Sequence, residues 1–302
     1  MKVGINMSII FRNYSPEPFF SDDYRKIRDF LTRINAEKIT TPRFLWGAWD
    51  WAGPPIWQRN LSSKIGLWED KGKIVALVTY QSRLGEGFLC LDESYPQLKT
   101  EMIMYAKENF QDEGKLVLSL PDNDNAFART AFEQGFRPTE SNDRALMLDI
   151  DMLQPYSLPD GFSFVSMADD WNWYQYHRVM WRGFNHEGKP SYDDKTISDR
   201  KSLLSIPLIK PEIRMCVVAP DGNYVSHCGM WYQPNDFYCY VEPVATDPEY
   251  RKMGLGKAVV LEAIKRCGEQ GAKHAIVGSN QQFYFNIGFY PIQTFTHWEL
   301  KG

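Results

Sequence analysis

Two closely spaced glycines, Gly254 and Gly256, point more directly to chemistry than any other residues of this sequence. They stand where an apolar segment, residues 240–246, passes through a short turn into a helical one. Each glycine inside a helix costs about 1 kcal/mol relative to alanine, so two glycines in a first helical turn need a reason. The unpaired amides of such a turn bind anions, and side chains there would obstruct a ligand. The pattern predicts a pyrophosphate site formed by Met253, Gly254, Leu255, Gly256, Lys257 and Ala258.

The charges around these glycines favour an anionic ligand. Arg251, Lys252 and Lys257 place local positive charge on a chain whose formal net charge is −4. Beyond Lys257, apolar residues recur at helical spacing, which predicts a helix that packs against the rest of the protein. A glycine-containing turn that binds no ligand is the alternative interpretation.

A carboxylate, Glu242, lies on the apolar segment that leads into the glycine turn. Alternation along a strand puts Tyr240 and Glu242 on one face. A carboxylate beside tyrosines in a partly buried cleft has a raised pKa, which suits a general base. We therefore expect Glu242 to act as the base, directly or through water, and Tyr240 to contact the substrate. The alternative is that Glu242 is a structural partner of a lysine or of the backbone.

A second apolar segment, residues 274–279, and an aromatic segment, residues 283–289, follow the predicted helix. The succession of strand, glycine turn, helix, strand and aromatic segment resembles the GNAT superfamily of acyl-CoA-dependent N-acyltransferases. The residues that match the family pattern are Arg251, Gly254, Gly256, Tyr284, Gly288 and Phe289. The resemblance implies acetyl-CoA as the acyl donor and direct attack by the primary amine of a small molecule, with no metal.

The resemblance also implies roles for single residues. Tyr284 matches the usual general acid; a free tyrosine is a weaker acid than a thiol by about 2 kcal/mol, so we expect it to hydrogen-bond the departing sulfur. The backbone of Val244, Ala245 and Thr246 would align the pantetheine arm like an added strand. Asn280 would contact the cofactor, although the segment between it and Tyr284 is shorter than in the family pattern. The alternative for Tyr284 is an ordinary packed aromatic side chain.

The loop at residues 181–188 is rich in polar and aromatic groups and lies where this fold forms one wall of the acceptor site. His186 and Glu187 are candidates to contact the acceptor amine. Two other functions stay open: an acyl-CoA-binding sensor that does not turn over, and an aminoacyl-transferring relative with duplicated domains. The retained Tyr284 favours catalysis over binding alone.

Composition limits the choice of partners. The 302 residues are 43% hydrophobic and 15% aromatic, which is ample for packed cores. Five scattered cysteines have neither a disulfide framework nor metal-ligand spacing, and no long basic run indicates a nucleic-acid partner. Residues 1–10 match neither a membrane span nor a signal peptide, so we expect a cytoplasmic protein without membrane association. The sequence does not indicate an oligomeric state.

An internal repeat divides the chain. Residues 131–138 read onto residues 284–291, and residues 88–93 read onto residues 237–242. The first copy has no glycine turn and has Ala131 where the second has Tyr284, so we expect a degenerate copy and one active centre. The predicted domains are residues 1–152 and 153–302, each an α/β (α+β) GNAT-like domain with a mixed, mostly antiparallel sheet flanked by helices.

Overall fold

The computed structural model describes residues 9–18, 20–53 and 58–301, so most of the segment 1–10 considered for a signal peptide lies outside the described residues. The chain forms two compact units. Unit 1 holds the residues up to Ala145, Gly278–Asn280 and the residues from Pro291 onward. Unit 2 holds Leu146–Val277 and Gln281–Tyr290.

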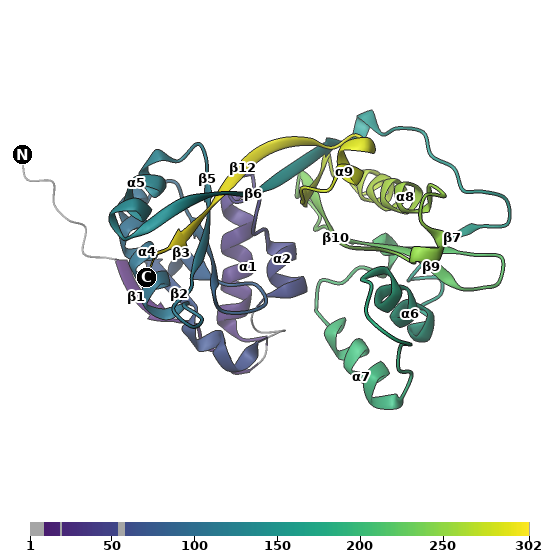
Figure 1. The fold of residues 1–302 in the computed structure, drawn as a ribbon, viewed down its shortest axis with the longest axis horizontal. Coiled ribbons are helices and arrows are strands. Elements are labelled where there is room, and N and C mark those ends of the chain that lie inside the picture. The colour runs from purple at the N-terminus through teal and green to yellow at the C-terminus, as the bar shows by residue number, and fades with distance from the viewer. Residues whose placement is uncertain (1–8, 19, 54–57, 302) are drawn as a thin grey trace, which may run out of the picture. The chain divides into compact units, whose positions relative to one another are not determined.

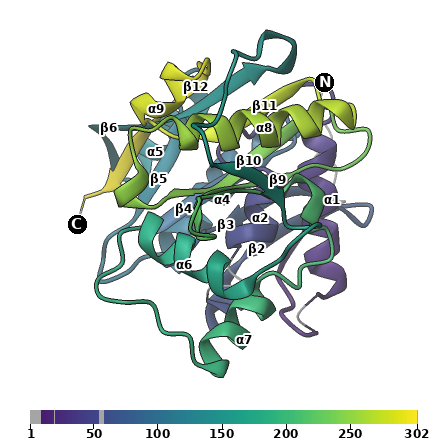
Figure 2. The same ribbon diagram turned by 90° about the vertical axis from the view of Figure 1, so that its right-hand side faces the viewer.

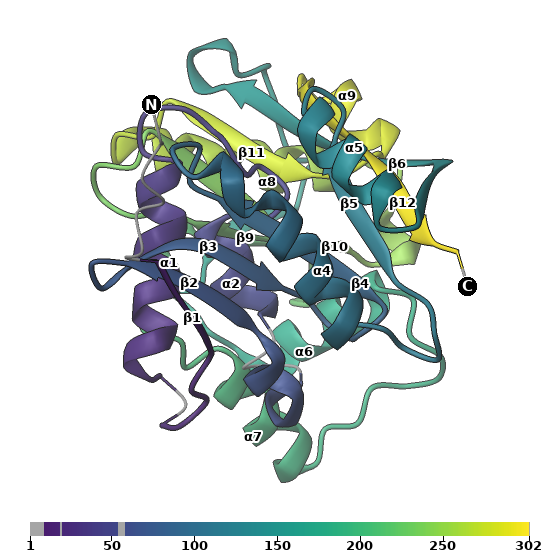
Figure 3. The ribbon, with the colours of Figure 1, turned by 90° about the vertical axis from the view of Figure 1, so that its left-hand side faces the viewer.

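Unit 1 contains most elements of the first half of the sequence. Its helices are α1 (Asp22–Ile34), α2 (Trp46–Ala52), α4 (Lys99–Asn109) and α5 (Asn125–Glu133), with 3-10 turns η1 (Arg59–Lys64) and η2 (Pro96–Leu98). Its strands are β1 (Ile9–Asn13), β2 (Gly66–Asp70), β3 (Lys73–Thr79), β4 (Glu86–Leu91), β5 (Val117–Pro121) and the first part of β6 (Phe136–Asp149). Strands β1 to β4 lie side by side and antiparallel, and β5 is parallel to β4 (Figure 3).

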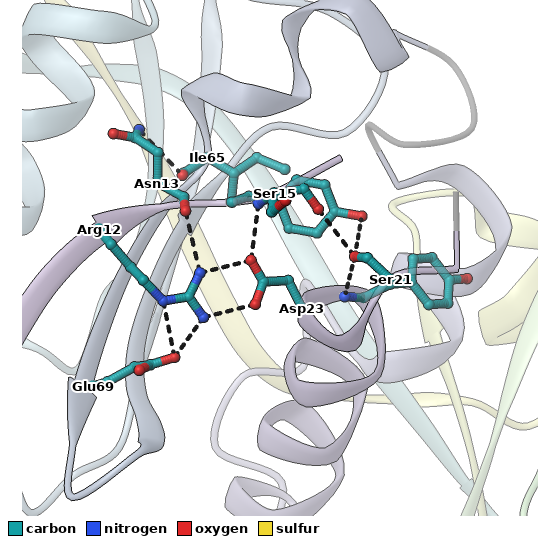
Figure 4. Close-up of polar contacts among 9 residues, drawn as sticks. Arg12, Asn13, Ser15, Ser21, Asp23, Ile65 and Glu69 are labelled. Atoms are coloured by element: carbon teal, nitrogen blue, oxygen red, sulfur yellow. Dashed lines mark hydrogen bonds and ion pairs between the residues drawn. The ribbon is translucent and has the colours of Figure 1, made fainter. Parts of the chain in front are cut away.

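Arg12 ties the edge strand of unit 1 to its first helix. The guanidinium of Arg12 on β1 donates to both carboxylate oxygens of Asp23 on α1, at 2.6 and 2.7 Å (Figure 4). It also contacts Glu69 of β2 at 2.6 Å. The helix begins at Ser21, whose hydroxyl accepts a hydrogen bond from the amide of Tyr24 and thereby satisfies one free donor of the first turn.

Unit 2 contains the segments in which chemistry is expected. Its strands are the end of β6, then β7 (Ser163–Ser166), β8 (Met215–Val218), β9 (Tyr224–Trp231), β10 (Tyr238–Thr246) and β11 (His274–Gly278). Its helices and 3-10 turns are η3 (Ile150–Met152), α6 (Trp173–Gly183), α7 (Asp194–Leu203), η4 (Pro211–Ile213), η5 (Pro248–Tyr250), α8 (Leu255–Glu269) and α9 (Gln282–Asn286).

The strands of unit 2 separate two layers of helices. Helix α8 lies on one face of β8 to β10, and α6 and α7 lie on the other (Figures 1 and 2). Successive side chains along each strand face opposite layers, because side chains alternate between the two faces of a sheet. On β10, Cys239 and Val241 belong to the hydrophobic core under α8, together with Val260 and Ile264 of that helix. Tyr240 and Glu242 therefore face the layer of α6.

The last strand of the sequence belongs to unit 1. Strand β12 (Tyr290–Leu300) pairs antiparallel with β5 from Phe295 to Glu299, although the helix that directly precedes it, α9, lies in unit 2. The compact units are thus not continuous stretches of sequence. The predicted boundary between residues 152 and 153 separates two copies of an ancestral repeat and not two compact units. That division into copies stays a prediction.

The predicted class of fold is confirmed. Helices and mostly antiparallel strands alternate as expected, and the apolar segments 240–246 and 274–279 of the second half correspond to β10 and β11. The predicted helix after the glycine turn is α8, which ends at Glu269 ahead of Gly271 in the left-handed region, with φ at 115°. In the described part of the chain, no helix is both long enough and apolar enough to cross a bilayer.

Candidate active site

Strand β10 separates from its neighbours at the point where the site is expected. Its antiparallel register with β9 shifts between Val241 and Val244, which is a bulge. Its parallel pairing with β11 joins Tyr238, Cys239 and Tyr240 to residues 274–276, while β10 itself continues to Thr246. The carboxyl ends of two parallel strands therefore diverge, and main-chain groups of residues 242–246 lie outside that pairing. Such diverging carboxyl ends are where ligands bind in open sheets.

The glycine turn has the backbone of an anion-binding loop. Lys252 and Gly254 both adopt left-handed conformations, with φ at 65° and 80°. Alternation of this kind turns successive amides toward one point. A Cβ built on Gly254 would meet no described atom within 4 Å, so the turn opens onto free space. The first turn of α8 follows directly, with Gly254 as its N-cap and without a capping side chain. The amides of residues 255–257 are thus available to an anion.

Gly256 lies closer to its surroundings than Gly254 does. A Cβ at Gly256 would lie 3.1 Å from Oγ1 of Thr246 and 3.4 Å from the ring of Phe283. This glycine therefore allows the start of α8 to approach the end of β10. The two glycines of the motif have different physical roles, one open to a ligand and one required by packing.

Arg251 is engaged with the protein itself. Its guanidinium donates to the carbonyls of Thr246 and Gly183 at 3.2 and 3.0 Å, and to the side chain of Asn185 at 2.9 Å. The turn is thereby tied to the end of α6. Lys257 is also held, since its Nζ lies 3.1 Å from Oε1 of Gln154. A cofactor role for Arg251 or Lys257 stays a prediction, and both contribute positive potential at the turn.

A buried carboxylate that the sequence reasoning missed, Asp247, anchors the turn. It is fully buried and contacts Arg182 at 2.6 Å and Arg178 at 3.1 Å, both from α6. Burial opposes ionisation, but the Arg182 hydrogen bond and the two positive charges outweigh it and hold the pKa of Asp247 below its usual value. The signal available in the sequence was an Asp-Pro pair at the end of a strand, which is typical of a turn.

Tyr284 is nearly enclosed. It lies on α9, is 7% exposed, and packs edge-on against the rings of Phe283 and Phe289 at 5.0 and 5.5 Å. Burial, followed by the negative charge of Glu242, raises the pKa of its hydroxyl far above the usual value. Tyr284 therefore stays protonated at neutral pH. The joint catalytic role of Tyr284 and Glu242 stays a prediction.

Glu242 lies at the bulge of β10 and is half-buried. Its main-chain carbonyl accepts a 2.9 Å hydrogen bond from the indole nitrogen of Trp231 on β9. Tyr240, two residues earlier on the same face, is 7% exposed. Val244 packs partly against the core under α8. Ala245 is buried and lies close to Gly183 of α6. A Cβ added at Gly183 would be only 2.7 Å from the Cβ of Ala245.

Three other predicted residues have surroundings that the structure describes. His186 and Glu187 are exposed in the turn after α6, and the ring of His186 lies 4.7 Å from that of Trp181. Asn280 belongs to unit 1, and its amide donates to the carbonyl of Asn142 at 2.6 Å. The roles of these three residues in binding stay predictions.

Unit 1 has a corresponding pair of diverging strands. β4 and β5 pair in parallel only at Glu86 and Gly87, and a cavity of about 500 Å³ lies between the later parts of these strands and the start of α4. Lys99 at the start of α4 is paired with Asp124 at 2.5 Å, and Ala131 on α5 is fully buried. This cavity lacks both a glycine turn and a tyrosine equivalent to Tyr284. Across the described residues of both units, no group of three or more His, Cys, Asp or Glu side chains is arranged to hold a metal.

Comparison with known families and structures agrees with this geometry. Residues 171–290 match the acetyltransferase (GNAT) family. The chain therefore contains a GNAT acetyltransferase domain, which comprises α6 to α9 with the strands between them, and this supports acyl transfer as the class of reaction. No curated protein sequence matches the chain.

Solved structures show the same fold over the whole chain. A GCN5-related N-acetyltransferase from Sphaerobacter thermophilus has a TM-score of 0.63 at 13% sequence identity. The matched region covers 97% of this chain and 95% of the chain of that protein. A tandem GNAT protein from the clavulanic acid biosynthesis pathway has a TM-score of 0.59 at 14% identity, with 96% and 98% covered. The glucosamine N-acetyltransferase region of a fungal multi-domain β-N-acetylglucosaminidase has a TM-score of 0.54 at 15% identity, with 96% and 38% covered. At these identities the likeness shows a shared fold alone.

Proposed function

We propose that this protein is an acetyl-CoA-dependent N-acetyltransferase that acetylates a primary amine of a small molecule. The observation that carries the proposal is the open glycine turn at Gly254, which leads into α8 beside the diverging end of β10. Main-chain amides at a helix start suit a pyrophosphate, and strand edges outside a pairing suit an amide-bearing arm. Acetyl-CoA has both groups. Bound acetyl-CoA would supply a thioester whose carbonyl carbon accepts the amine nitrogen and whose sulfur departs with the bonding electrons.

Binding is assigned to three stretches of unit 2. The amides of residues 253–258 would hold the pyrophosphate, with Lys252 adding positive charge at the mouth of the turn. The diverging edge at Val244, Ala245 and Thr246 would align the pantetheine arm. Holding the donor and the amine together contributes much of the rate, since it replaces an encounter in solution by a fixed geometry.

Proton handling is assigned to Glu242 and Tyr284. An alkyl ammonium has a pKa of about 10, so it must lose a proton before its nitrogen can attack. Glu242, half-buried at the bulge, would accept that proton directly or through water. Because burial and Glu242 raise its pKa, Tyr284 stays neutral and would donate a hydrogen bond to the sulfur as negative charge develops there. Tyr284 would therefore stabilise the leaving group more than it protonates it.

Calorimetry with acetyl-CoA and a free-thiol release assay over a panel of amines test the proposal. We expect saturable binding of acetyl-CoA and thiol release that depends on an amine. No affinity for acetyl-CoA or for any longer acyl-CoA would rule the proposal out. Tight binding without thiol release on any amine would instead support the acyl-CoA-binding sensor.

Two variants separate the catalytic assignments from binding. Tyr284→Phe keeps the ring packing against Phe283 and Phe289 and removes only the hydroxyl. We expect kcat to fall by about 10²-fold, the usual effect of a positioned proton donor, with the Kd for acetyl-CoA unchanged. Glu242→Gln is expected to lower kcat below the pKa of the amine and to recover part of the rate at high pH. Full turnover in either variant would contradict that assignment.

We propose a cytoplasmic location because the cysteines form no disulfides among the described residues. All five, Cys90, Cys216, Cys228, Cys239 and Cys267, are buried free thiols. Reduced cysteines in this number are typical of a reducing compartment.

A further inference from the structure

Arg214 is a buried cation that forms no direct ion pair with any described residue. Its side chain is 1% exposed, and none of its three guanidinium nitrogens has a hydrogen-bond partner among the described residues. Its one close partner is the ring of Trp231, whose centroid lies 4.7 Å from Cζ. Burying a charge costs free energy unless it is paired, so an unpaired guanidinium needs an explanation.

Arg214, Gly229 and Glu242 form a row across three strands of unit 2. The register that pairs Met215 with Cys228 brings Arg214 opposite Gly229 when it is continued by one residue. On the other side, Val241 pairs with Met230, which places Glu242 beside Gly229 at the bulge. Neighbouring strands lie about 4.8 Å apart, so the main chains of Arg214 and Glu242 are separated by about 10 Å.

Gly229 leaves the centre of this row without a side chain. A Cβ there would lie 2.5 Å from Nη1 of Arg214 and 2.8 Å from the carbonyl oxygen of Glu242. The guanidinium therefore leans over Gly229 toward the strand that carries Glu242. The row faces the α6 layer, because Cys228 and Met230 on either side of Gly229 belong to the opposite core.

Two further unpaired groups line the same face. The hydroxyl of Tyr176 on α6 and Nε2 of His227 on β9 are buried, and neither has a hydrogen-bond partner in the part of the chain that the structure describes; the two rings lie 5.0 Å apart. Burial, with Arg214 nearby, lowers the pKa of His227 to about 3, so this ring is neutral. Burial raises the pKa of Tyr176 to about 12, so its hydroxyl keeps its proton. A cation and two neutral groups thus share one buried region, where the negative charge of Glu242 acts on both Arg214 and Tyr176.

We propose that Arg214, with Tyr176 and His227, forms a subsite for a carboxylate carried by the acceptor amine. This inference rests on the proposed function, and it names the substrate class as amino acids and related amino carboxylates. The amine end would lie toward half-buried Glu242 and the carboxylate end toward Arg214. Because the guanidinium is almost enclosed, side chains around it must move for the carboxylate to enter.

The chemistry of the subsite favours a carboxylate over a phosphate. A single guanidinium binds a planar monoanion with two parallel hydrogen bonds. Tyr176 and His227 add neutral groups but no second positive charge, so a dianion would be left partly uncompensated. Glu242 supplies the matching negative charge for the ammonium of the incoming amine, and a zwitterion would complement both ends of the row.

Amine pairs that differ only in the carboxylate test this subsite. The probes are lysine against cadaverine, ornithine against putrescine, and β-alanine against ethylamine, compared by kcat/KM for thiol release at fixed acetyl-CoA. We expect the carboxylate-bearing member of at least one pair to be preferred by about 30-fold or more, the effect of one buried charge pair. Equal kcat/KM within every pair would overturn the proposal.

The variants Arg214→Met and Arg214→Lys test whether Arg214 causes the preference for the carboxylate-bearing amine. We expect Arg214→Met to remove the preference, so that the two amines of a pair have similar kcat/KM, whereas Arg214→Lys keeps part of the preference. Removing an uncompensated buried charge is also expected to leave Tm unchanged or higher, whereas removing a purely structural arginine would lower it. Lys265→Met, at an exposed position of α8, is the matched control and should change neither measurement. A preference that survives in Arg214→Met would overturn the assignment.

Failure of the proposed function is distinguishable from failure of the subsite. If no amine is acetylated, thermal shifts of the CoA-saturated protein with lysine and with cadaverine replace the assay. Stabilisation by lysine alone that is lost in Arg214→Met would support the subsite. Equal shifts with lysine and cadaverine would overturn it.

Discussion

The indole nitrogen of Trp231 donates a 2.9 Å hydrogen bond to the main-chain carbonyl of Glu242. The same indole ring lies under the guanidinium of Arg214. One side chain of β9 thus supports both ends of the row that crosses unit 2. The bulge at Glu242 lies outside the regular pairing of β9 with β10, and this bond is one of the contacts that give it a defined position.

Trp231→Phe is expected to loosen the bulge. Phenylalanine keeps most of the apolar contact but leaves the Glu242 carbonyl without this donor, which costs about 1–3 kcal/mol. We expect a lower free energy of unfolding in urea and a lower kcat with a smaller change in the Kd for acetyl-CoA. Trp173→Phe removes an indole from α6 whose ring stacks on Trp171, and serves as the control. An unchanged kcat in Trp231→Phe would show that the bond does not position Glu242.

Gly254→Ala and Gly222→Ala form a matched pair. Both glycines have positive φ, at 80° and 84°, and a Cβ at either would meet no described atom within 4 Å. The strain of a left-handed alanine, about 1–2 kcal/mol, should therefore lower stability equally in both variants. Only Gly254→Ala is expected to raise the Kd for acetyl-CoA, by about 10-fold or 1.4 kcal/mol. Calorimetry gives this comparison, and equal Kd values would contradict the pyrophosphate assignment.

The ion pair of Arg182 and Asp247 is expected to give a pH-dependent term in stability. The pKa of Asp247 in the folded protein lies below its ordinary value of 3.8, because the arginine contacts outweigh burial. The unfolded chain therefore binds the proton more readily. The stabilisation is fully present above about pH 4 and is lost as pH falls through the folded pKa.

Arg182→Met should reduce this dependence, because it removes the 2.6 Å contact. We expect the free energies of unfolding of the wild type and of Arg182→Met to differ at pH 7 and to converge as the pH falls through the folded-state pKa of Asp247, as measured by urea denaturation. Lys195→Met removes a pair at a fully exposed position and should follow the wild-type curve. A constant difference between wild type and Arg182→Met at all pH values would contradict the assignment.

Phe295→Ala tests whether the end of the sequence stabilises unit 1. Phe295 is 5% exposed on β12, opposite Pro121 of β5. We expect a loss of about 3–5 kcal/mol, and faster hydrogen exchange of the β5 amides. Phe285→Ala, on α9, should instead affect the core under α8. Unchanged exchange in β5 would mean that β12 contributes little to unit 1.

The glycine turn, the helix after it and the alternating strands were predictable because they are local. Gly254, Gly256 and the apolar period beyond them lie within a few turns of chain, and backbone sterics make such patterns readable. The GNAT resemblance rested on this stretch together with the following strand and the aromatic segment at Tyr284, and it is confirmed for residues 171–290. The roles of Glu242 and Tyr284 stay predictions.

Only the tertiary structure decided which distant residues meet. Nothing in the spacing of Arg214, Gly229 and Glu242 marks them as a row, since their meeting depends on the register of three strands and on a bulge between two of them. The assignment of β12 to unit 1 is likewise a matter of pairing across the chain. The sequence by itself determined the glycine turn and the type of each local element, because these depend on nearby backbone. The burial of side chains, the partners of charged groups and the pairing of strands depend on contacts between segments that are far apart in the sequence. Only the folded structure shows these contacts.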